Sequence, residues 1–557
     1  MISIRTAIGS LALALAFILP FGSASAASPM SEVSTANVPF SNDEGNFMSA
    51  LISPNGQNVY FGSGTGPGSA IRMATDPLAY SGSNLDGLAT ERLWSSAVRS
   101  PDGSYGYWGV FDDLGGGVRK PGAVKVDLST MSRVASVPLT AQPVGIPTAA
   151  GISPSGNYGY FATYDETQVV GSEINKLVRL DLATMASPTT LNLLATDLKP
   201  TSVLVQPDGQ YAYLGCDSGR IVKINLQTMT RVGSIDLSAN GFFRTAVISP
   251  DGRYGYFATR NNPAKVVKVD LDNFSQVGSA TSLGAANVAS SAISPDGAYG
   301  YFGTETSPGK VVRVRLSSMT VDDTLTFGIG KDYSDSLVVS PDGQFAYVGT
   351  LTLSPAKVIK VKLADKTNLT VSKSGSGTVS GSGIDCGNTC SISRLDYQDL
   401  AIQLQATPDP GQVFTGWSGA CSGTGACQVT LDQNRAVSAT FAAAPNPEPT
   451  KPTLAVSSLK GKLTRKAASL SSKVTVNLPG KVSQRATSKK GKKTRTWCRA
   501  SKTATKVGTY ALKCNLGKKG RAALRRSALK LTLRTTFTPT TGSAVTVNRK
   551  LTLKRKR

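Results

Sequence analysis

Short runs in which apolar and polar residues alternate fill residues 46–363, and Gly, Pro, Asn and Asp residues separate these runs. One unit contains TAVIS at 245–249, YGYFA at 254–258 and KVVKVDL at 265–271. Alternation with a period of two places successive side chains on opposite faces of a strand. The pattern therefore predicts β-strands joined by tight turns.

This unit recurs seven times. A turn of the Ser-Pro-Asp-Gly type begins at residues 53, 100, 153, 206, 249, 294 and 340, and its prolines lie 43 to 53 residues apart. Several units add a further alternating run, such as RVGSIDL at 231–237. Four strands in a repeat of about 45 residues are typical of a propeller blade. We predict an all-β chain that begins with a seven-bladed β-propeller at residues 27–366.

The acidic residue of the turn has two interpretations: a repeated metal-binding or catalytic carboxylate, or a turn former. Five copies carry Asp, but the first carries Asn55 and the third carries Ser155. All three side chains can accept a hydrogen bond from the turn backbone, and the Gly that follows supplies the positive φ. Because a carboxylate ligand could not be replaced by serine without loss, we interpret this residue as a turn former.

Two further positions keep their residue type in every repeat. A tyrosine recurs in the second strand and a basic residue in the third: Tyr60, Tyr107, Tyr160, Tyr213, Tyr256, Tyr301 and Tyr347; Arg72, Lys125, Arg179, Lys223, Lys268, Arg313 and Lys360. These side chains could line a binding face, or they could pack between the blades with their polar ends at a wetter edge. A specific small-molecule site usually breaks the symmetry of a repeat, so we favour packing.

The seventh repeat lacks an outer strand, because the chain leaves it after the run at 356–363. Residues 30–40 (MSEVSTANVPF) resemble the outer strand at 131–139 (MSRVASVPL). We therefore predict that residues 31–40 pair with residues 356–363 and close the ring, which hides its open edges.

The Ser-Pro-Asp-Gly turn, the Tyr-x-Tyr strand and the Val-Lys/Arg-Val-Asp-Leu strand resemble the YVTN-type repeats of bacterial surface-layer propellers over about residues 30–366. The resemblance implies a seven-bladed ring. Related propellers include binding proteins and lactonases, and the lactonases rely on His and acidic residues in a central pocket. This chain contains no His.

The lack of His excludes Ser-His-Asp, Cys-His and His-metal chemistry. We predict no catalytic residue, no metal site and no cofactor. The alternative is an extracellular propeller enzyme, lyase-like or lactonase-like, that uses carboxylates in irregular loops: Asp112, Asp113, Asp165 and Glu166.

Residues 367–443 alternate between short strands and Gly-Ser turns, and they contain Cys386, Cys390, Cys421 and Cys427. The spacing differs from the paired C-x2-C of zinc sites, and the chain carries an export signal, so disulfides are favoured. We predict the local pairs 386–390 and 421–427, although four cysteines allow three connectivities. The motifs GSGTV, GWSGAC and VSATF resemble the divergent InlB B-repeat-like modules of bacterial surface proteins, which implies a stalk or adhesive unit. Cys216, in a blade, is expected to be a buried, unpaired residue.

Residues 444–452 are rich in Pro and predict an extended linker. Residues 453–557 alternate again, and predict β-strands with a short helix at 517–526 and a bridge between Cys498 and Cys514. The last 40 or so residues resemble a C-terminal β-sandwich module of exported actinobacterial proteins, and this resemblance implies a β-sandwich-like module at residues 453–557.

Charge is divided unevenly along the chain. Residues 451–557 contain 30 Lys and Arg and no Asp or Glu, which leaves 30 basic residues against all 35 acidic ones elsewhere. So many unbalanced cations repel one another, and we expect them to bind anionic cell-envelope polymers or surface glycans; another surface protein is a further candidate partner. Nucleic acid would satisfy the same electrostatics, but export and the lack of an aromatic platform disfavour it. The residues expected to bind the polyanion are Lys489, Lys490, Lys492, Lys493, Arg495, Lys518, Lys519, Arg521, Arg525 and Arg526.

Residues 1–26 have the pattern of a secretory signal peptide: Arg5, an apolar stretch at 7–21 and an A-x-A cleavage site at 24–26. The apolar stretch is short for a bilayer span, which needs about 20 residues, and we expect no transmembrane segment in the mature chain. We therefore predict a secreted, modular cell-surface protein in which the propeller is a binding scaffold and the basic module holds it to the envelope.

Overall fold

The computed structural model describes residues 27–38, 46–64, 66–115, 118–140, 145–164, 175–284, 287–351, 355–386, 389–398, 400–445, 450–464 and 466–554. The predicted signal peptide lies outside these ranges. The chain forms two compact units, Met1–Ala442 and Ala443–Arg557. Both consist almost entirely of β-strands, so the predicted all-β class is confirmed. In the part of the chain that the structure describes, no helix is both long enough and apolar enough to cross a membrane.

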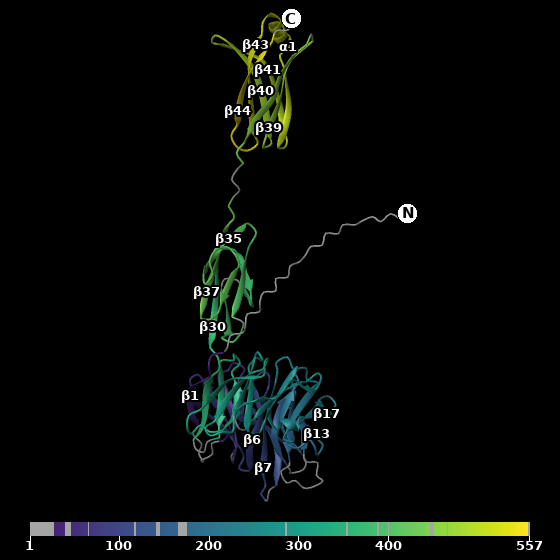
Figure 1. Ribbon diagram of the computed structural model, residues 1–557, viewed down its shortest axis with the longest axis vertical. Coiled ribbons are helices and arrows are strands. Elements are labelled where there is room, and N and C mark those ends of the chain that lie inside the picture. Colours follow the sequence, from purple (N-terminus) through teal and green to yellow (C-terminus); the bar gives the residue numbers. More distant parts are fainter. Residues whose placement is uncertain are drawn as a thin grey trace, which may run out of the picture. The chain divides into compact units, whose positions relative to one another are not determined.

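Seven antiparallel sheets occupy the first unit up to residue 362, and the inner strand of each sheet contacts the inner strands of its two neighbours. Six sheets follow in chain order, and the seventh combines both ends of the propeller chain. The strands are β2 (Phe47–Ile52), β3 (Asn58–Ser63), β4 (Ser69–Thr75), β5 (Leu78–Asp86); β6 (Glu91–Arg99), β7 (Tyr105–Asp113), β8 (Arg119–Asp127), β9 (Ser132–Pro138); β10 (Ile146–Ile152), β11 (Tyr158–Tyr164), β12 (Asn175–Asp181), β13 (Ala186–Asn192); β14 (Pro200–Val205), β15 (Tyr211–Cys216), β16 (Arg220–Asn225), β17 (Thr230–Asp236); β18 (Phe243–Ile248), β19 (Tyr254–Thr259), β20 (Lys265–Asp270), β21 (Ser275–Gln276), β22 (Thr281–Ser282); β23 (Val288–Ile293), β24 (Tyr299–Thr304), β25 (Lys310–Arg315), β26 (Thr320–Thr326); and β27 (Ser334–Val339), β28 (Phe345–Thr350), β29 (Ala356–Lys362) with β1 (Ser31–Val38). A 3-10 turn, η1 (Ser238–Asn240), precedes β18. Because β27 also contacts β2, the ring is closed, and the predicted propeller arrangement is confirmed. Figure 1 shows the propeller, with β1, β6, β7, β13 and β17 labelled.

The N-terminal strand closes the seventh sheet. Strand β1 pairs antiparallel with β29, from Ser31 opposite Lys362 to Val38 opposite Ala356. The predicted pairing is therefore confirmed for residues 31–38, while residues 39 and 40 lie outside the described residues. Arg313, only 1% exposed, donates to the carbonyls of Ser28 (3.0 Å) and Leu363 (2.7 Å), which holds the segment before β1 in place.

Two four-stranded sheets follow the propeller and share one apolar core around Trp417 and Phe441. Their strands are β30 (Lys366–Ser374), β31 (Gly377–Gly381), β32 (Ile384–Cys386), β33 (Thr389–Leu395), β34 (Ala401–Pro408), β35 (Gln412–Gly419), β36 (Cys427–Thr430) and β37 (Arg435–Ala443). The turn after β33 packs on the propeller. The Tyr397 ring lies edge-on to the Tyr299 ring, with 4.8 Å between the ring centroids, and Gln398 Nε2 donates a hydrogen bond to Asp296 Oδ2 over 2.8 Å.

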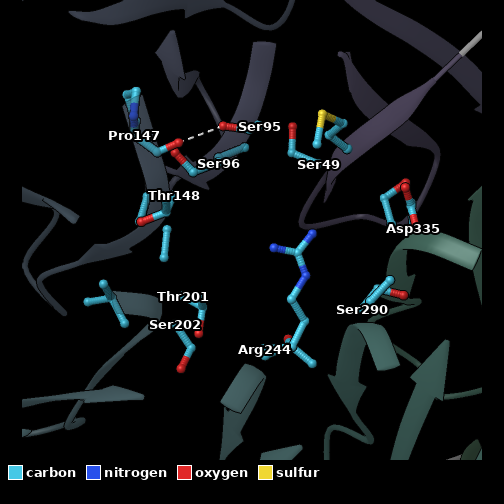
Figure 2. Close-up of a pocket in the computed structure, with 18 of the residues that line it drawn as sticks. Ser49, Ser95, Ser96, Pro147, Thr148, Thr201, Ser202, Arg244, Ser290 and Asp335 are labelled. Atoms are coloured by element: carbon cyan, nitrogen blue, oxygen red, sulfur yellow. Dashed lines mark hydrogen bonds between the residues drawn. The ribbon is translucent and has the colours of Figure 1, made fainter. Parts of the chain in front are cut away.

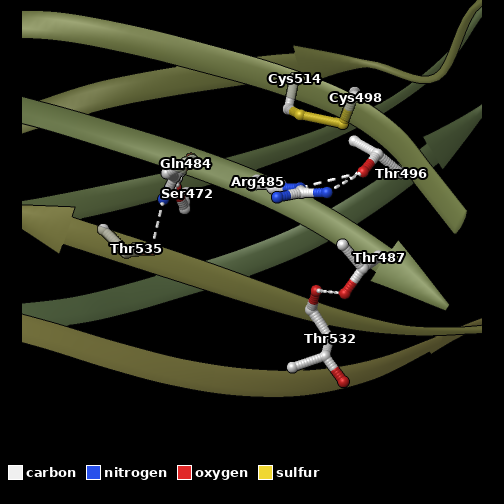
Figure 3. Close-up of a disulfide and its surroundings, with 9 residues drawn as sticks. All are labelled: Ser472, Gln484, Arg485, Thr487, Thr496, Cys498, Cys514, Thr532 and Thr535. Carbon is white, nitrogen blue, oxygen red and sulfur yellow. Dashed lines mark hydrogen bonds between the residues drawn. A yellow bond between two sulfur atoms is a disulfide. The ribbon is translucent and has the colours of Figure 1, made fainter. Parts of the chain in front are cut away.

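In its described residues, the second unit contains two sheets and one helix, and two apolar clusters between the sheets form its core. One sheet has the order β38-β39-β42 and the other β41-β40-β43-β44. The elements are β38 (Leu454–Leu463), β39 (Ala468–Val476), β40 (Gly480–Lys490), β41 (Lys493–Ala504), β42 (Gly508–Asn515), α1 (Gly517–Arg526), β43 (Leu529–Pro539) and β44 (Val545–Leu553). The predicted short helix is therefore confirmed. Between the sheets, Gln484 Nε2 donates to the hydroxyls of Ser472 (2.8 Å) and Thr535 (3.0 Å) (Figure 3).

Candidate functional site

The seven Ser-Pro-Asp-Gly turns have a structural role. In each turn, the side chain of the third residue accepts a hydrogen bond from the backbone N–H two positions later, over 2.9–3.4 Å. Asn55 and Ser155 do this in the same way as the aspartates. The glycines have φ values of 70–78°, and a Cβ there would lie 2.4–3.4 Å from the proline of the neighbouring turn. The interpretation as a turn former is confirmed, and the turns also pack the blades together.

The recurring basic and tyrosine residues pack between blades. In every blade the basic residue of the third strand donates to a backbone carbonyl of the next blade, over 2.7–3.5 Å. This ring of contacts closes where Lys360 Nζ donates to the carbonyl of Thr75. All seven tyrosines are buried, and burial raises the pKa of Tyr107 and Tyr256 to about 12. The packing interpretation is confirmed.

A central cavity of about 340 Å³ lies between the inner strands of the propeller. Ser, Thr, Ala and a few larger apolar side chains form most of its wall. Several hydroxyls connect neighbouring inner strands: Ser49 donates to the Trp94 carbonyl, Ser95 to that of Pro147 and Ser290 to that of Ser334, over 2.6–2.8 Å. These hydroxyls therefore stabilise the ring. Among the described lining residues, the charged ones are Lys199, Arg244 and Asp335.

Each inner strand has a β-bulge near its start, where its register against the second strand shifts. A bulge inserts an unpaired residue and changes the direction of its side chain. The inserted positions are Met48, Leu93–Ser95, Thr148, Thr201, Arg244, Ala289 and Asp335. Two of them are charged, in the fifth and seventh blades. Figure 2 shows Arg244 extending into the middle of the cavity, with Asp335 on the wall beside it.

Neither of these two charges is well paired. Arg244 Nε is buried without a hydrogen-bond partner and lies 3.9 Å from Glu305 Oε1. Asp335 Oδ1 is also buried without a partner. Burial, together with the nearby negative charge of Glu305, raises the pKa of Asp335 to about 6, while Arg244 acts in the opposite direction. Sequence reasoning did not identify either residue, because a bulge leaves no distinctive residue pattern in the inner strand.

The carboxylates considered for an enzyme do not meet in this cavity as far as the structure describes them. Asp112 Oδ1 accepts from the Thr90 hydroxyl (3.3 Å), Asp113 Oδ1 accepts from the Gly115 N–H (3.1 Å), and neither lines the cavity. Asp165 and Glu166 lie outside the described residues. Within the described ranges, no group of three or more His, Cys, Asp or Glu residues could hold a metal ion.

Three disulfides join six of the seven cysteines. The pairs are Cys386–Cys390, Cys421–Cys427 and Cys498–Cys514, with Cα–Cα distances of 5.4–5.6 Å. These are the pairs expected from the sequence, and they leave no thiolates for a zinc site among these residues. The last pair joins β41 to β42, and so links the two sheets of the second unit (Figure 3). Cys216 is a buried free thiol, and burial raises its pKa.

One face of the sheet β41-β40-β43-β44 presents only basic and uncharged polar residues. Arg485 on β40 lies directly opposite Arg499 on β41 and Arg534 on β43, so three arginines form a row across the sheet. All three side chains are exposed. Arg485 donates to the Thr496 hydroxyl through Nε (2.9 Å) and Nη2 (2.6 Å) (Figure 3). Like charges directly opposite one another destabilise a sheet. An anion bound from outside the chain would reduce the repulsion between these three arginines.

A groove of about 640 Å³ lies on the same face beside the arginine row. Lys489, Lys530 and Lys550 line it together with threonine hydroxyls and apolar stems. Thr532 lies opposite Thr487 on one side and Lys550 on the other, which places the groove next to the arginines in the register. We call the three arginines and three lysines the basic sheet face: Arg485, Arg499, Arg534, Lys489, Lys530 and Lys550.

The predicted polyanion-binding residues lie in three places. Lys489 belongs to the basic sheet face. Lys490 ends β40, Lys492 lies in the turn that follows, and Lys493 and Arg495 lie at the start of β41, all four exposed. On α1 lie Lys518, Lys519, Arg521, Arg525 and Arg526. The other five members of the basic sheet face were not predicted, because they do not lie in dense runs of charge. Basic residues at alternate strand positions would have indicated them.

Residues 367–445 match the family model of the divergent InlB B-repeat domain, so the resemblance expected for this module is confirmed. No curated protein matches the chain in sequence. Among solved structures, the chain is similar to a hydrazine synthase of Kuenenia stuttgartiensis, with 17% identity and a TM-score of 0.47 over 58% of this chain and 97% of that chain. At this TM-score the likeness supports no statement about function.

Proposed function

We propose that this protein is an exported, modular surface protein whose second unit binds an anionic polymer of the cell envelope through the basic sheet face. The propeller acts as its binding scaffold, with repeats of the YVTN type. The observation that carries the proposal is the row of three exposed arginines beside a lysine-lined groove, in a segment without any acidic residue.

The charge arrangement favours a polymer over an isolated ion. A guanidinium group binds phosphate, sulfate or carboxylate through two parallel hydrogen bonds. Neighbouring strands lie about 4.8 Å apart, so the arginine row presents three such groups at short, regular intervals. A linear polyanion can neutralise all of them at once, and it thereby relieves their mutual repulsion.

The other modules fit an extracellular location. Disulfides form and persist in oxidising compartments, and both smaller β-modules contain them. The InlB B-repeat-like module packs against the propeller through Tyr397 and Gln398 and so supports it as part of one unit. Hydroxyl groups line much of the propeller's central cavity, and we propose that the propeller acts by binding.

Binding of the full-length chain to immobilised poly(glycerol phosphate) tests the proposal. Replacing Arg485, Arg499 and Arg534 by Gln should weaken binding at least about tenfold, since exposed ion pairs contribute up to about 1 kcal/mol each. Binding should also fall steeply in about 0.5 M salt, where the screening length is only a few ångströms.

A matched control variant removes the same charge from the helix. Replacing Lys518, Lys519 and Arg525 by Gln lowers the net charge by the same amount but leaves the sheet face intact. This variant should bind within about threefold of the original chain. Equal losses in the two variants would show that only total charge matters, and binding that resists salt would refute the electrostatic mechanism.

A further inference from the structure

The two charged residues that break the symmetry of the propeller cavity point to a second binding site, which does not depend on the proposed polymer binding. We propose that the cavity binds a small zwitterion of the amino-acid class, with its carboxylate on Arg244 and its ammonium group on Asp335.

Within the fold, Arg244 has only a long ion pair, 3.9 Å from Glu305 Oε1, and no ion pair of Asp335 is found among the described residues. The structure contains no ion pair between Arg244 and Asp335, although both line one cavity. Arg244 Nε and Asp335 Oδ1 are buried without hydrogen-bond partners. Burying charged groups with unmade hydrogen bonds costs folding free energy. A bound ligand would supply the missing partners.

The corresponding positions of the other blades show what the fold alone requires. There the inserted residues are Met48, Thr148, Thr201, Ala289 and the segment 93–95, none of which is charged. The Thr148 and Thr201 hydroxyls donate to backbone carbonyls of the next blade. A small polar or apolar residue is therefore sufficient at this position, and the Arg and the Asp exceed what packing needs.

The placement of the charges specifies the chemistry of the ligand. Arg244 and Asp335 lie two blades apart, and the blade between them contributes the small Ala289. A lone anion would be attracted by Arg244 but repelled by Asp335. A lone cation would be attracted by Asp335 but repelled by Arg244. A neutral sugar would leave Asp335 without a counter-charge and Arg244 with only its long ion pair to Glu305, whereas a zwitterion supplies a close counter-charge to both.

Two further features limit the site. The third charged lining residue, Lys199, has its Nζ 5.3 Å from the centre of the Tyr164 ring, so its charge already has a contact. The cavity volume of about 340 Å³ is near the lower end of the range of about 300–1,000 Å³ for ligand pockets. This volume favours a ligand of the size of a free amino acid.

Calorimetric titration of the full-length chain at neutral pH tests the inference, with L-alanine as the probe and acetate and methylammonium as its two halves. Alanine should bind, and each half should bind at least about tenfold more weakly, because it compensates one charge only. Arg244→Gln and Asp335→Asn should each weaken alanine binding at least about tenfold.

Arg260→Gln is the matched control for the arginine. Arg260 Nε also lies 3.9 Å from a Glu305 oxygen, but Arg260 does not line the cavity. Its substitution should leave alanine affinity within about twofold, and thermal unfolding should verify that every variant is folded. The inference is overturned if glycine, alanine, serine and glutamate all fail to bind at about 10 mM, if Arg244→Gln and Asp335→Asn bind like the original chain, or if acetate or glucose binds as tightly as alanine.

Discussion

Asp335→Asn should stabilise the propeller at neutral pH, although it removes a charge that the proposed ligand needs. In the folded chain, burial raises the pKa of Asp335 from 3.8 to about 6. The folded state therefore binds this proton more tightly than the unfolded chain does. The stabilising contribution of the proton is complete below about pH 4 and is lost as the pH rises through about 6. Two pKa units at about 1.4 kcal/mol each give a cost of about 3 kcal/mol for ionised Asp335.

Asparagine has nearly the same shape and cannot ionise, so the variant avoids this cost. Urea unfolding at pH 7.5 should show Asp335→Asn to be more stable by up to about 3 kcal/mol, and the difference should shrink towards zero at pH 4. The control is Asp208→Asn, at an exposed turn position where another repeat carries Asn55, and it should stay within about 0.5 kcal/mol at both pH values. A stability difference for Asp335→Asn that is independent of pH, or a loss at pH 7.5, would refute the reasoning.

Three further predictions concern stability, each checked by urea or thermal unfolding. Gly103→Ala should cost about 1–3 kcal/mol more than Gly82→Ala, because both glycines have a positive φ but only a Cβ at Gly103 would lie 2.4 Å from the neighbouring turn proline; equal losses would contradict this packing role. Arg313→Met should destabilise the propeller by about 3–5 kcal/mol and make the N-terminal strand accessible to limited proteolysis, and a strand that stays protected would contradict its anchoring role. Replacing Cys498 and Cys514 by Ser should lower the stability of the second unit by about 3 kcal/mol, since this disulfide spans 16 residues. An unchanged unfolding midpoint under non-reducing conditions would contradict this stabilising role of the disulfide.

The repeats made much of the propeller predictable, because copies within one chain can be compared with one another. Asn55 and Ser155 in place of Asp separated a turn former from a ligand, and the hydrogen bonds agree. The likeness between residues 30–40 and an outer strand predicted how the ring closes. Both inferences depend on local chemistry that each repeat has to satisfy for itself.

The arginine row could not be predicted from the sequence in the same way. Arg485, Arg499 and Arg534 are separated along the chain, and each is an ordinary exposed residue of an alternating strand. They become neighbours only through the register of β40 with β41 and β43. A register shift of one residue would turn each arginine to the other face of its sheet. The dense basic run at 489–495 was easier to recognise, but it lies at the ends of β40 and β41 and in the turn between them, away from the arginine row.

The sequence by itself determined the strands, the turns, the number of repeats and the division of charge, because alternation and turn preferences act between residues close together in the chain. The tertiary structure decided which charges face one another and which face a cavity. Bulges in β18 and β27 direct Arg244 and Asp335 into the propeller cavity, and a bulge depends on how two strands pair rather than on one strand's own residues. The functional hypotheses for both units therefore rest on contacts between residues distant in sequence.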